Sequence, residues 1–347
     1  AVKSAYQTIQ KHYCHLEKMR LSKPKLHSER ITTMHLKELI KRHEQRALKT
    51  VPEWMIGCFK RKSISFSNGK TDEETQVFWL QGRNLTIDLR LPIGADQIKK
   101  TWQTCSQEEL YQLTNYEGWS ANSHWDSHQL SWSGGTAFQL HNRWPEPGIL
   151  SRTGDCMMEF SPSNAYVEDW RIKSRAQGTL LSLELIEEKN LTTETCRHRG
   201  GALIINGNWA GLVLGRTEAM HQATPDQQLR DLIKSQRCNT NLAKQIFNFE
   251  TSVAEGSLDN GFKITYSTQP SLINETIIPL EGFEFDTKQN EIFQLYNENG
   301  DTILRRFSID TIEPSFNYSA CTAWTSESKQ WFEKEQETLG RYLQDIR

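Results

Sequence analysis

The chain has 347 residues, with 41 basic and 43 acidic side chains and a formal net charge of −2. This length suits one large domain or two ordinary ones, and the balanced charge argues against nucleic-acid binding through a general basic field. No run of about 18 apolar residues is present to span a membrane, and the seven scattered cysteines form no Cys-x-x-Cys pair for a zinc ribbon or a thioredoxin-type site.

The first 50 residues differ from the rest of the chain in charge and pattern. They hold 12 basic and 4 acidic residues and no glycine, and Ile31, Leu39 and Ile40 fall on one face of a predicted helix. We therefore predict a basic helical extension over residues 1–50. It either covers the open end of a barrel or docks electrostatically onto an acidic partner. It lacks the apolar core of a secretory signal, so we expect a cytoplasmic protein.

From Val51 onward, short alternating runs separated by turn residues predict β-strands. Residues 85–92, LTIDLRLP, show this pattern best, because leucine and isoleucine alternate with Thr86, Asp88 and Arg90. A period of two gives the strand one apolar face and a second face that carries an acid and a base. In a closed barrel, that second face looks either into the lumen or out to water.

Helical segments interrupt the strands. Ser106 and Glu109 have the spacing of a capping box at the start of SQEELYQLTNYEG, and TPDQQ predicts a second helix from Thr224 to about Cys238. Many short strands with a few peripheral helices favour barrels or sandwiches over a doubly wound sheet. We predict a mainly β fold with two antiparallel β-barrels or half-barrels, over residues 51–178 and 179–324, followed by a C-terminal helix over residues 325–347.

Four short motifs resemble a known family. They are WLQ-x6-DLRLP (79–92), YEGW (116–119), MEF-x5-Y-x-E-x-W (158–170) and I-x-G-x-W-x-G (205–211). These features resemble calycins, and more narrowly the lipocalin-like two-barrel proteins of fungi and bacteria, over roughly residues 54–215. The resemblance implies calycin-like barrels, most of them in proteins of unassigned function. Calycins bind lipids, bilins or haem, and some are cyclases or isomerases, so the resemblance implies a fold more than a function.

Asp88 and Arg90 are the first candidates for a functional site. If their face lines a barrel, they form an ion pair whose burial is expensive unless it is hydrogen-bonded or functional. We then expect Arg90 to orient a ligand carboxylate or carbonyl and Asp88 to hold Arg90 in place. Gln81, on the preceding strand, is predicted to bind substrate. The alternative is that Asp88 and Arg90 both face water.

Three histidines, His124, His128 and His141, lie within 18 positions of one another. Three histidines on neighbouring strands could bind zinc or iron, but His124 and His128 lie in a serine- and asparagine-rich stretch that predicts a solvated loop. We therefore predict no metal. His141 follows a predicted strand and is a candidate general acid or base, because histidine titrates near neutral pH.

Glu159 is the second candidate for proton transfer. Met157 and Glu159 share one face of the strand CMMEF, and a glutamate that faces an aromatic-lined barrel has its acidity weakened by desolvation. The alternative is a glutamate that faces solvent at a strand edge. Large aromatic side chains are predicted to line the substrate pocket: they are Trp79, Trp119, Trp132, Trp144 and Tyr166.

The chain has no phosphate-binding loop, no dinucleotide-binding glycine motif and no G-x-S-x-G nucleophile elbow. We predict a cofactor-independent isomerase, cyclase or lyase that acts on a small hydrophobic or aromatic substrate in a tryptophan-lined barrel. A carrier for a pigment, a lipid or a haem-like ligand is the first alternative, since it needs only the pocket. A protein-interaction scaffold, with both barrels filled by their own side chains, is the second.

Overall fold

Antiparallel strands make up most of the part of the chain that the structure describes. This computed structural model describes residues 33–140, 146–220, 224, 226–235, 240–319 and 325–343. Its strands form two antiparallel sheets, which confirms the predicted mainly β fold. Met34–Arg347 form one compact unit, and Ala1–Thr33 count as a separate one that lies almost wholly outside the described residues. None of the described helices is long and apolar enough to cross a membrane.

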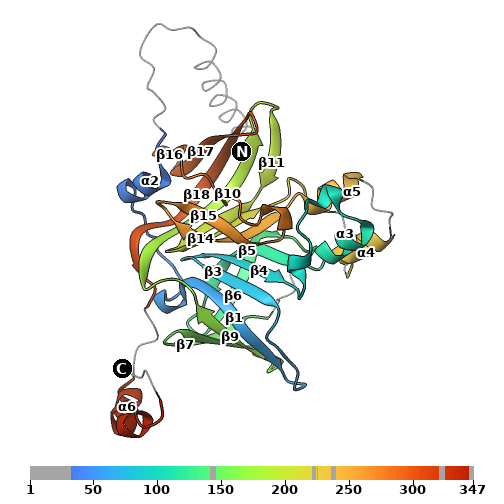
Figure 1. Ribbon diagram of the computed structural model, residues 1–347. Coiled ribbons are helices and arrows are strands. Elements are labelled where there is room, and N and C mark those ends of the chain that lie inside the picture. Colours follow the sequence, from blue (N-terminus) through green and yellow to red (C-terminus); the bar gives the residue numbers. More distant parts are fainter. Residues whose placement is uncertain are drawn as a thin grey trace. The chain divides into compact units, whose positions relative to one another are not determined.

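The first sheet closes into an eight-stranded barrel (Figure 1). Each strand pairs with the next one along the chain, and β1 closes the ring by pairing with β9. The members are β1 (Gly57–Phe66), β3 (Gln76–Gln81), β4 (Leu85–Leu91), β5 (Glu117–Trp125), β6 (Gln129–Ala137), β7 (Gly148–Thr153), β8 (Cys156–Phe160) and β9 (Tyr166–Ile172). A two-residue strand, β2 (Thr71–Asp72), pairs with the end of β1. This up-and-down order is compatible with a calycin-like barrel.

Strand β4 shows which side chains face the inside of the barrel. Its leucines and isoleucine are buried against the second sheet, in a cluster that includes Ile204. Thr86, Asp88 and Arg90 therefore face the lumen, because successive side chains of a strand point to opposite faces. Asp88 pairs across the ladder with Trp119, which lines the same lumen. This part of the barrel is apolar outside and polar within.

The second sheet is open. Its strand order is β15-β14-β13-β12-β10-β18-β17-β16, with β11 beside β10. The strands are β10 (Gln177–Asn190), β11 (Thr195–Arg199), β12 (Gly201–Asn206), β13 (Trp209–Leu214), β14 (Glu250–Ser257), β15 (Gly261–Ser267), β16 (Phe283–Asp286), β17 (Glu291–Glu298) and β18 (Asp301–Asn317). The two predicted barrels or half-barrels are thus one closed barrel and one open sheet. The boundaries predicted for separate domains stay a prediction.

The central strands of the second sheet, β12 and β13, are buried on both faces. One face packs against the barrel and the other contributes to a second apolar cluster, which explains why these strands are apolar without alternation. A two-residue turn, Gly207–Asn208, joins them, and Gly207 has the positive φ of +67° that such hairpin turns favour.

Short helices cover the sheets. The predicted helix after Ser106 is confirmed as α3 (Gln107–Leu113), with its capping box to Glu109. The second predicted helix begins later than Thr224, as α4 (Leu229–Ser235), and its predicted end at Cys238 lies outside the described residues. The C-terminal helix is α6 (Ser326–Leu339). The remaining described helices are α2 (Leu36–Arg42), η1 (Glu53–Met55), η2 (Ala95–Gln97), η3 (Trp102–Thr104), α5 (Thr240–Phe247) and η4 (Pro270–Leu272).

The N-terminal helix α2 packs against the second sheet and not against the barrel. Its buried side chains, Leu36, Leu39 and Ile40, join the apolar cluster of the second sheet. The cap is His35, whose Nδ1 accepts a hydrogen bond from the backbone N–H of Lys37.

Buried polar contacts fix the barrel to the second sheet. Arg83, in the turn between β3 and β4, is 1% exposed and forms a fork with Glu313 of β18, with Nη2 to Oε2 at 2.9 Å. Beside it, Asn84 Nδ2 donates to Asp310 at 2.9 Å. These bonds orient the β3–β4 hairpin, which carries much of the site described below.

Candidate functional site

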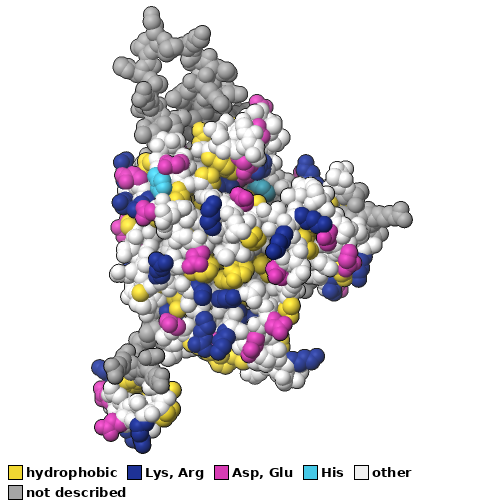
Figure 2. Space-filling view, viewed as in Figure 1, with side chains coloured by type: hydrophobic (Ala, Val, Ile, Leu, Met, Phe, Trp, Pro, Cys, Tyr) yellow, Lys and Arg dark blue, Asp and Glu magenta, His cyan; other side chains and the backbone are white. Residues whose placement is uncertain are grey.

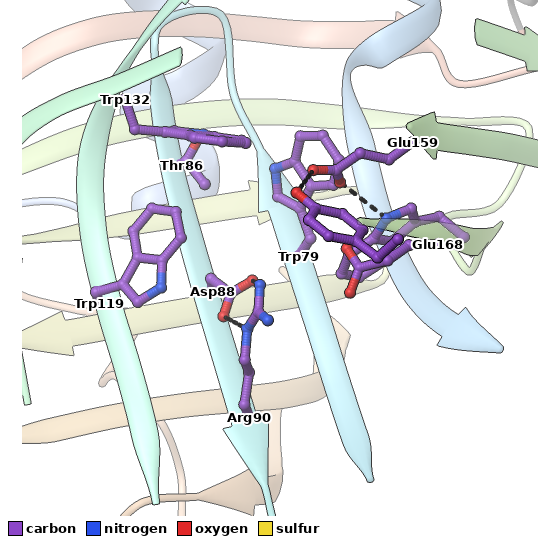
Figure 3. Close-up of a pocket in the computed structure, with 10 residues that line it drawn as sticks. Trp79, Thr86, Asp88, Arg90, Trp119, Trp132, Glu159 and Glu168 are labelled. Carbon is purple, nitrogen blue, oxygen red and sulfur yellow. Dashed lines mark hydrogen bonds and ion pairs between the residues drawn. The ribbon is translucent and has the colours of Figure 1, made fainter. Parts of the chain in front are cut away.

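The barrel encloses a small polar cavity (Figure 3). Its lining consists of Trp79, Thr86, Asp88, Arg90, Trp119, Trp132, Glu159, Tyr166, Glu168 and Trp170. In the close-up, Trp119 and Trp132 lie on one side, Glu159 and Glu168 lie on the other, and Asp88 lies between them. The lining comes from strands β3 to β6, β8 and β9, so only a closed barrel brings it together.

Asp88 and Arg90 form a forked ion pair inside the barrel. The Arg90 Nε–Asp88 Oδ1 distance is 2.8 Å and the Nη2–Oδ2 distance is 3.2 Å, and the side chains are 13% and 5% exposed. Burial acts to lower the pKa of Arg90, but the carboxylates of Asp88, Glu168 and Glu117 outweigh it and raise that pKa above its usual range. Arg90 is therefore a fixed cation, held in one orientation by Asp88.

Glu159 is a buried carboxyl group with no ion-pair partner among the described residues. Its Oε2 accepts a hydrogen bond from Trp170 Nε1 at 3.1 Å and its Oε1 accepts one from the Tyr166 hydroxyl at 3.4 Å. Burial raises its pKa to about 8, and the charge of Glu168 adds to the rise against the opposing effect of Arg90. Glu159 is thus mostly protonated at neutral pH.

Glu168, which faces Glu159 across the β8–β9 ladder, is held differently. Its Oε1 accepts from Arg61 Nη1 at 2.8 Å, and the second guanidinium nitrogen of Arg61 donates to Asp72 at 2.7 Å. One of two neighbouring carboxyl groups is therefore neutralised by an arginine and the other by a proton. A carboxyl group whose pKa is raised towards neutrality in this way is a common basis for acid–base chemistry.

Four tryptophan rings surround these charges. The centroid of Trp79 lies 5.4 Å from that of Trp170 and 6.2 Å from that of Trp132, and Trp132 lies 6.0 Å from Trp119, all edge to face. The indole Nε1 atoms of Trp119 and Trp132 are buried and have no hydrogen-bond partner among the described residues. Buried donors without a partner are rare and call for an explanation, such as a bound molecule.

Gln81 holds two residues of the cavity lining, Trp79 and Thr86, in place. Its Oε1 accepts hydrogen bonds from Trp79 Nε1 at 3.0 Å and from the Thr86 hydroxyl at 2.7 Å, and its Nε2 donates to Ser123 at 3.0 Å. Gln81 does not line the cavity itself. It fixes Trp79 and Thr86, so it acts as a positioning residue where the sequence predicts substrate contact.

The inner cavity measures only ≈ 20 Å³, which is room for one or two water molecules. A larger cavity of ≈ 370 Å³ adjoins it, and Trp119 lines both. This outer cavity lies beside β6, whose residues beyond Leu130 pair with β5 and, within the described residues, not with β7. Of the two cavities, the outer one has the space for a molecule larger than water.

The structure brings together most of the residues that the sequence predicts. Seven line the inner cavity: Trp79, Asp88, Arg90, Trp119, Trp132, Glu159 and Tyr166. His141 and Trp144 lie outside the described residues. His124 and His128 are exposed, and no group of three or more potential metal ligands is found in the described part of the chain.

The sequence reasoning did not select three of the lining residues, Thr86, Glu168 and Trp170. Thr86 lies on the same face of β4 as Asp88 and Arg90, so the alternation along this strand could have identified it as a lining residue. Glu168 and Trp170 form the Y-x-E-x-W alternation with Tyr166, but the sequence alone did not show that this face pairs with Glu159.

Comparison of the chain with protein-family models, with curated proteins and with solved structures found no match.

Proposed function

We propose that the lining of the barrel lumen supplies the reacting groups for a small organic molecule bound beside it, and that the chemistry is a cofactor-independent isomerisation, cyclisation or elimination. Glu159 moves a proton, and Arg90 stabilises negative charge that develops on the substrate. The observation that carries this proposal is a buried glutamate without an ion pair to a described residue and an oriented arginine, which line one tryptophan-walled cavity.

The cost of burying these groups supports the proposal. A lumen filled with apolar side chains would stabilise the barrel without the desolvation penalty of several buried charges. Glu159 in particular lacks the arginine partner that Glu168 has. Perturbed carboxyl groups beside a cavity concentrate at functional sites, because catalysis needs an acid whose pKa lies near the working pH.

Glu159 alone suits a reaction without net proton change. Glu159 in its protonated form donates its proton to one atom of the substrate, and the resulting carboxylate removes a proton from another atom. The electrons of the bond to the departing proton remain in the substrate, so a double bond moves or a leaving group departs. No redox partner is needed for this sequence.

A carrier remains the second candidate, and it is favoured by the unpaired indole donors of Trp119 and Trp132, which any bound ligand would satisfy. The barrel would then be calycin-like in function as well as in strand order. The scaffold alternative has less support on the face seen in Figure 2, where acidic and basic side chains are intermixed and hydrophobic side chains form only small patches.

Activity-based metabolite profiling tests the proposal. The purified protein, its Glu159→Gln variant and its Arg90→Gln variant are each incubated with a small-molecule extract of its own cells, and the products are followed by mass spectrometry. We expect the wild-type protein to convert one compound into an isomer or an elimination product and both variants to lose at least about 100-fold of the rate. A compound that is bound unchanged by all three proteins would establish the carrier instead.

A further inference from the structure

We propose that the outer cavity is a binding site for a small aromatic or conjugated organic anion, with Arg216 as the group that receives its charge. This inference rests on the proposed function in one respect, since it makes the outer cavity the place where the substrate of the barrel is held. The cavity is lined by β5, by the second half of β6 and by the residues that follow β13. Its volume of ≈ 370 Å³ falls in the range of small-molecule sites.

Two glycines allow a bulge in the strand that lines this cavity. Gly134 and Gly135 on β6 both have positive φ, +67° and +73°, and the β5–β6 register shifts between Ser120 and Asn122. A Cβ on Gly135 would lie 1.8 Å from the carbonyl oxygen of Ser120, so no larger residue fits there without a backbone shift. Bulges of this kind frequently lie beside ligand sites, where they redirect a strand.

Two buried polar groups at this cavity have no hydrogen-bond partner in the described part of the chain. They are the hydroxyl of Ser120, a residue that is 3% exposed, and the indole N–H of Trp119. Both residues line the cavity. Leaving a buried donor unpaired costs free energy, and an acceptor oxygen of a ligand in the outer cavity would satisfy the Ser120 hydroxyl. The Trp119 nitrogen points towards Asp88 and the inner cavity (Figure 3). Trp119 also offers its ring to an aromatic ligand.

Arg216 brings a positive charge to the same cavity. Its hydrogen bonds with described residues go to neutral carbonyl groups: its Nη2 donates to Ile246 at 2.7 Å and to Phe138 at 2.9 Å, and its Nη1 donates to Ala137 at 3.1 Å. It makes no ion pair with a described residue, and burial lowers its pKa to about 10. A partly buried guanidinium without a carboxylate attracts an anion.

Two glutamates, Glu117 and Glu218, also line the outer cavity. Neither forms an ion pair with Arg216. Glu117 pairs with Arg90 across the β4–β5 ladder and raises the pKa of that arginine, so its charge acts on the inner cavity. Glu218 is exposed. A ligand bound with its anionic end at Arg216 would place its aromatic body against Trp119, which is the residue shared with the inner cavity.

A pair of fluorescent probes tests the site. One is 8-anilino-1-naphthalenesulfonate, an aromatic anion, and the other is N-phenyl-1-naphthylamine, which has the same ring system without the charge. We expect the anion to bind the wild-type chain more tightly, and Arg216→Gln to weaken its binding at least about tenfold while leaving the neutral probe within about threefold. Arg216→Lys keeps the charge and should retain most of the anion affinity.

Two further variants complete the experiment. Ala219→Trp fills the cavity from an exposed lining position and should weaken both probes, whereas Arg42→Gln removes an exposed charge from α2 and should weaken neither. The proposal is overturned if Arg216→Gln binds the anion as well as wild type, if it loses both probes equally, or if neither probe binds wild type. Retained turnover in Glu159→Gln would defeat the proposed function alone and would leave the probe result standing.

Discussion

Glu159 in the barrel and Glu188 in the second sheet are both buried glutamates, but their surroundings differ. Glu188 is completely buried and pairs with Arg305 at 2.6 Å and with Arg197 at 3.1 Å. Burial acts to raise its pKa, and the neighbouring positive charges outweigh burial and hold that pKa below its usual range. Glu159 has hydrogen bonds from an indole and a phenol and no ion pair with a described residue, and its pKa is raised.

The comparison separates two uses of a buried carboxyl group. In the second sheet the charge is matched by arginines on β11 and β18, so Glu188 is ionised and joins three strands. In the barrel the carboxyl group lies beside a cavity and keeps a proton that it can transfer. Burial alone does not indicate function, and the presence or absence of a matching charge is the informative difference.

Neutralising each glutamate is the strongest test of this comparison. Glu188→Gln leaves Arg305 and Arg197 without their central carboxylate, and we expect a loss of about 3 kcal/mol in the free energy of unfolding at pH 7. Glu159→Gln replaces one neutral group by another in the folded state and removes the ionisation that favours the unfolded chain at pH 7. We therefore expect this free energy to stay the same or to rise by up to about 3 kcal/mol. Urea denaturation measures both values.

Glu187, the preceding residue of β10, is the matched control for Glu188. Its side chain is 14% exposed and its contact with Arg306 is longer, at 3.3 Å. We expect Glu187→Gln to cost no more than about 1 kcal/mol. If Glu159→Gln destabilised the protein as much as Glu188→Gln, Glu159 would be an ionised structural residue and the contrast between the two regions would be wrong.

The raised pKa of Glu159 should make the free energy of unfolding depend on pH. The unfolded chain releases the Glu159 proton near pH 4.5, whereas the folded chain holds it to about pH 8. Between these values the folded state binds more protons at this group. The contribution of Glu159 to the free energy of unfolding is therefore greatest below pH 4.5 and falls as pH rises to 8, by up to about 1.4 kcal/mol per pH unit. Glu159→Gln should flatten this slope.

Glu250 of the second sheet affects the dependence of stability on pH over a different pH range. Burial raises its pKa to about 7, against a hydrogen bond from Ser252 that acts to lower it. Glu250→Gln should therefore remove part of the slope between about pH 5 and 7 and leave the part between 7 and 8 unchanged. A slope that both variants leave intact would show that neither carboxyl group holds its proton in the folded state.

The sequence predicts local patterns well and long-range ones poorly. Alternation on β4 identified the face that carries Asp88 and Arg90, and the Ser106 capping box located α3, because each depends on residues a few positions apart. Whether that face looked into the lumen depended on the second sheet, which buries the opposite face. No pattern within β4 contains that information.

Arg216 illustrates what the sequence could not predict. Its guanidinium is held by carbonyl groups of β6, of the residue after it and of α5, segments that lie about 30 or more positions away. Carbonyl acceptors occur at every residue, so such contacts leave no signature in composition or spacing. The unpaired Ser120 hydroxyl is equally invisible, because its isolation is a property of the packed structure.

Replacing single tryptophans of the inner cavity gives the smallest expected effect, a change in the pKa of Glu159. Trp170 Nε1 donates to Glu159, which acts to lower the pKa of that carboxyl group, whereas Trp132 Nε1 has no partner among the described residues. Trp170→Phe should therefore raise the pKa of Glu159 by up to about one unit, and Trp132→Phe should leave it unchanged. Carbon-13 NMR of the labelled glutamate carboxyl groups follows the titration. Equal shifts in both variants would mean that Glu159 responds to the packing of the cavity as a whole and not to the indole that bonds it.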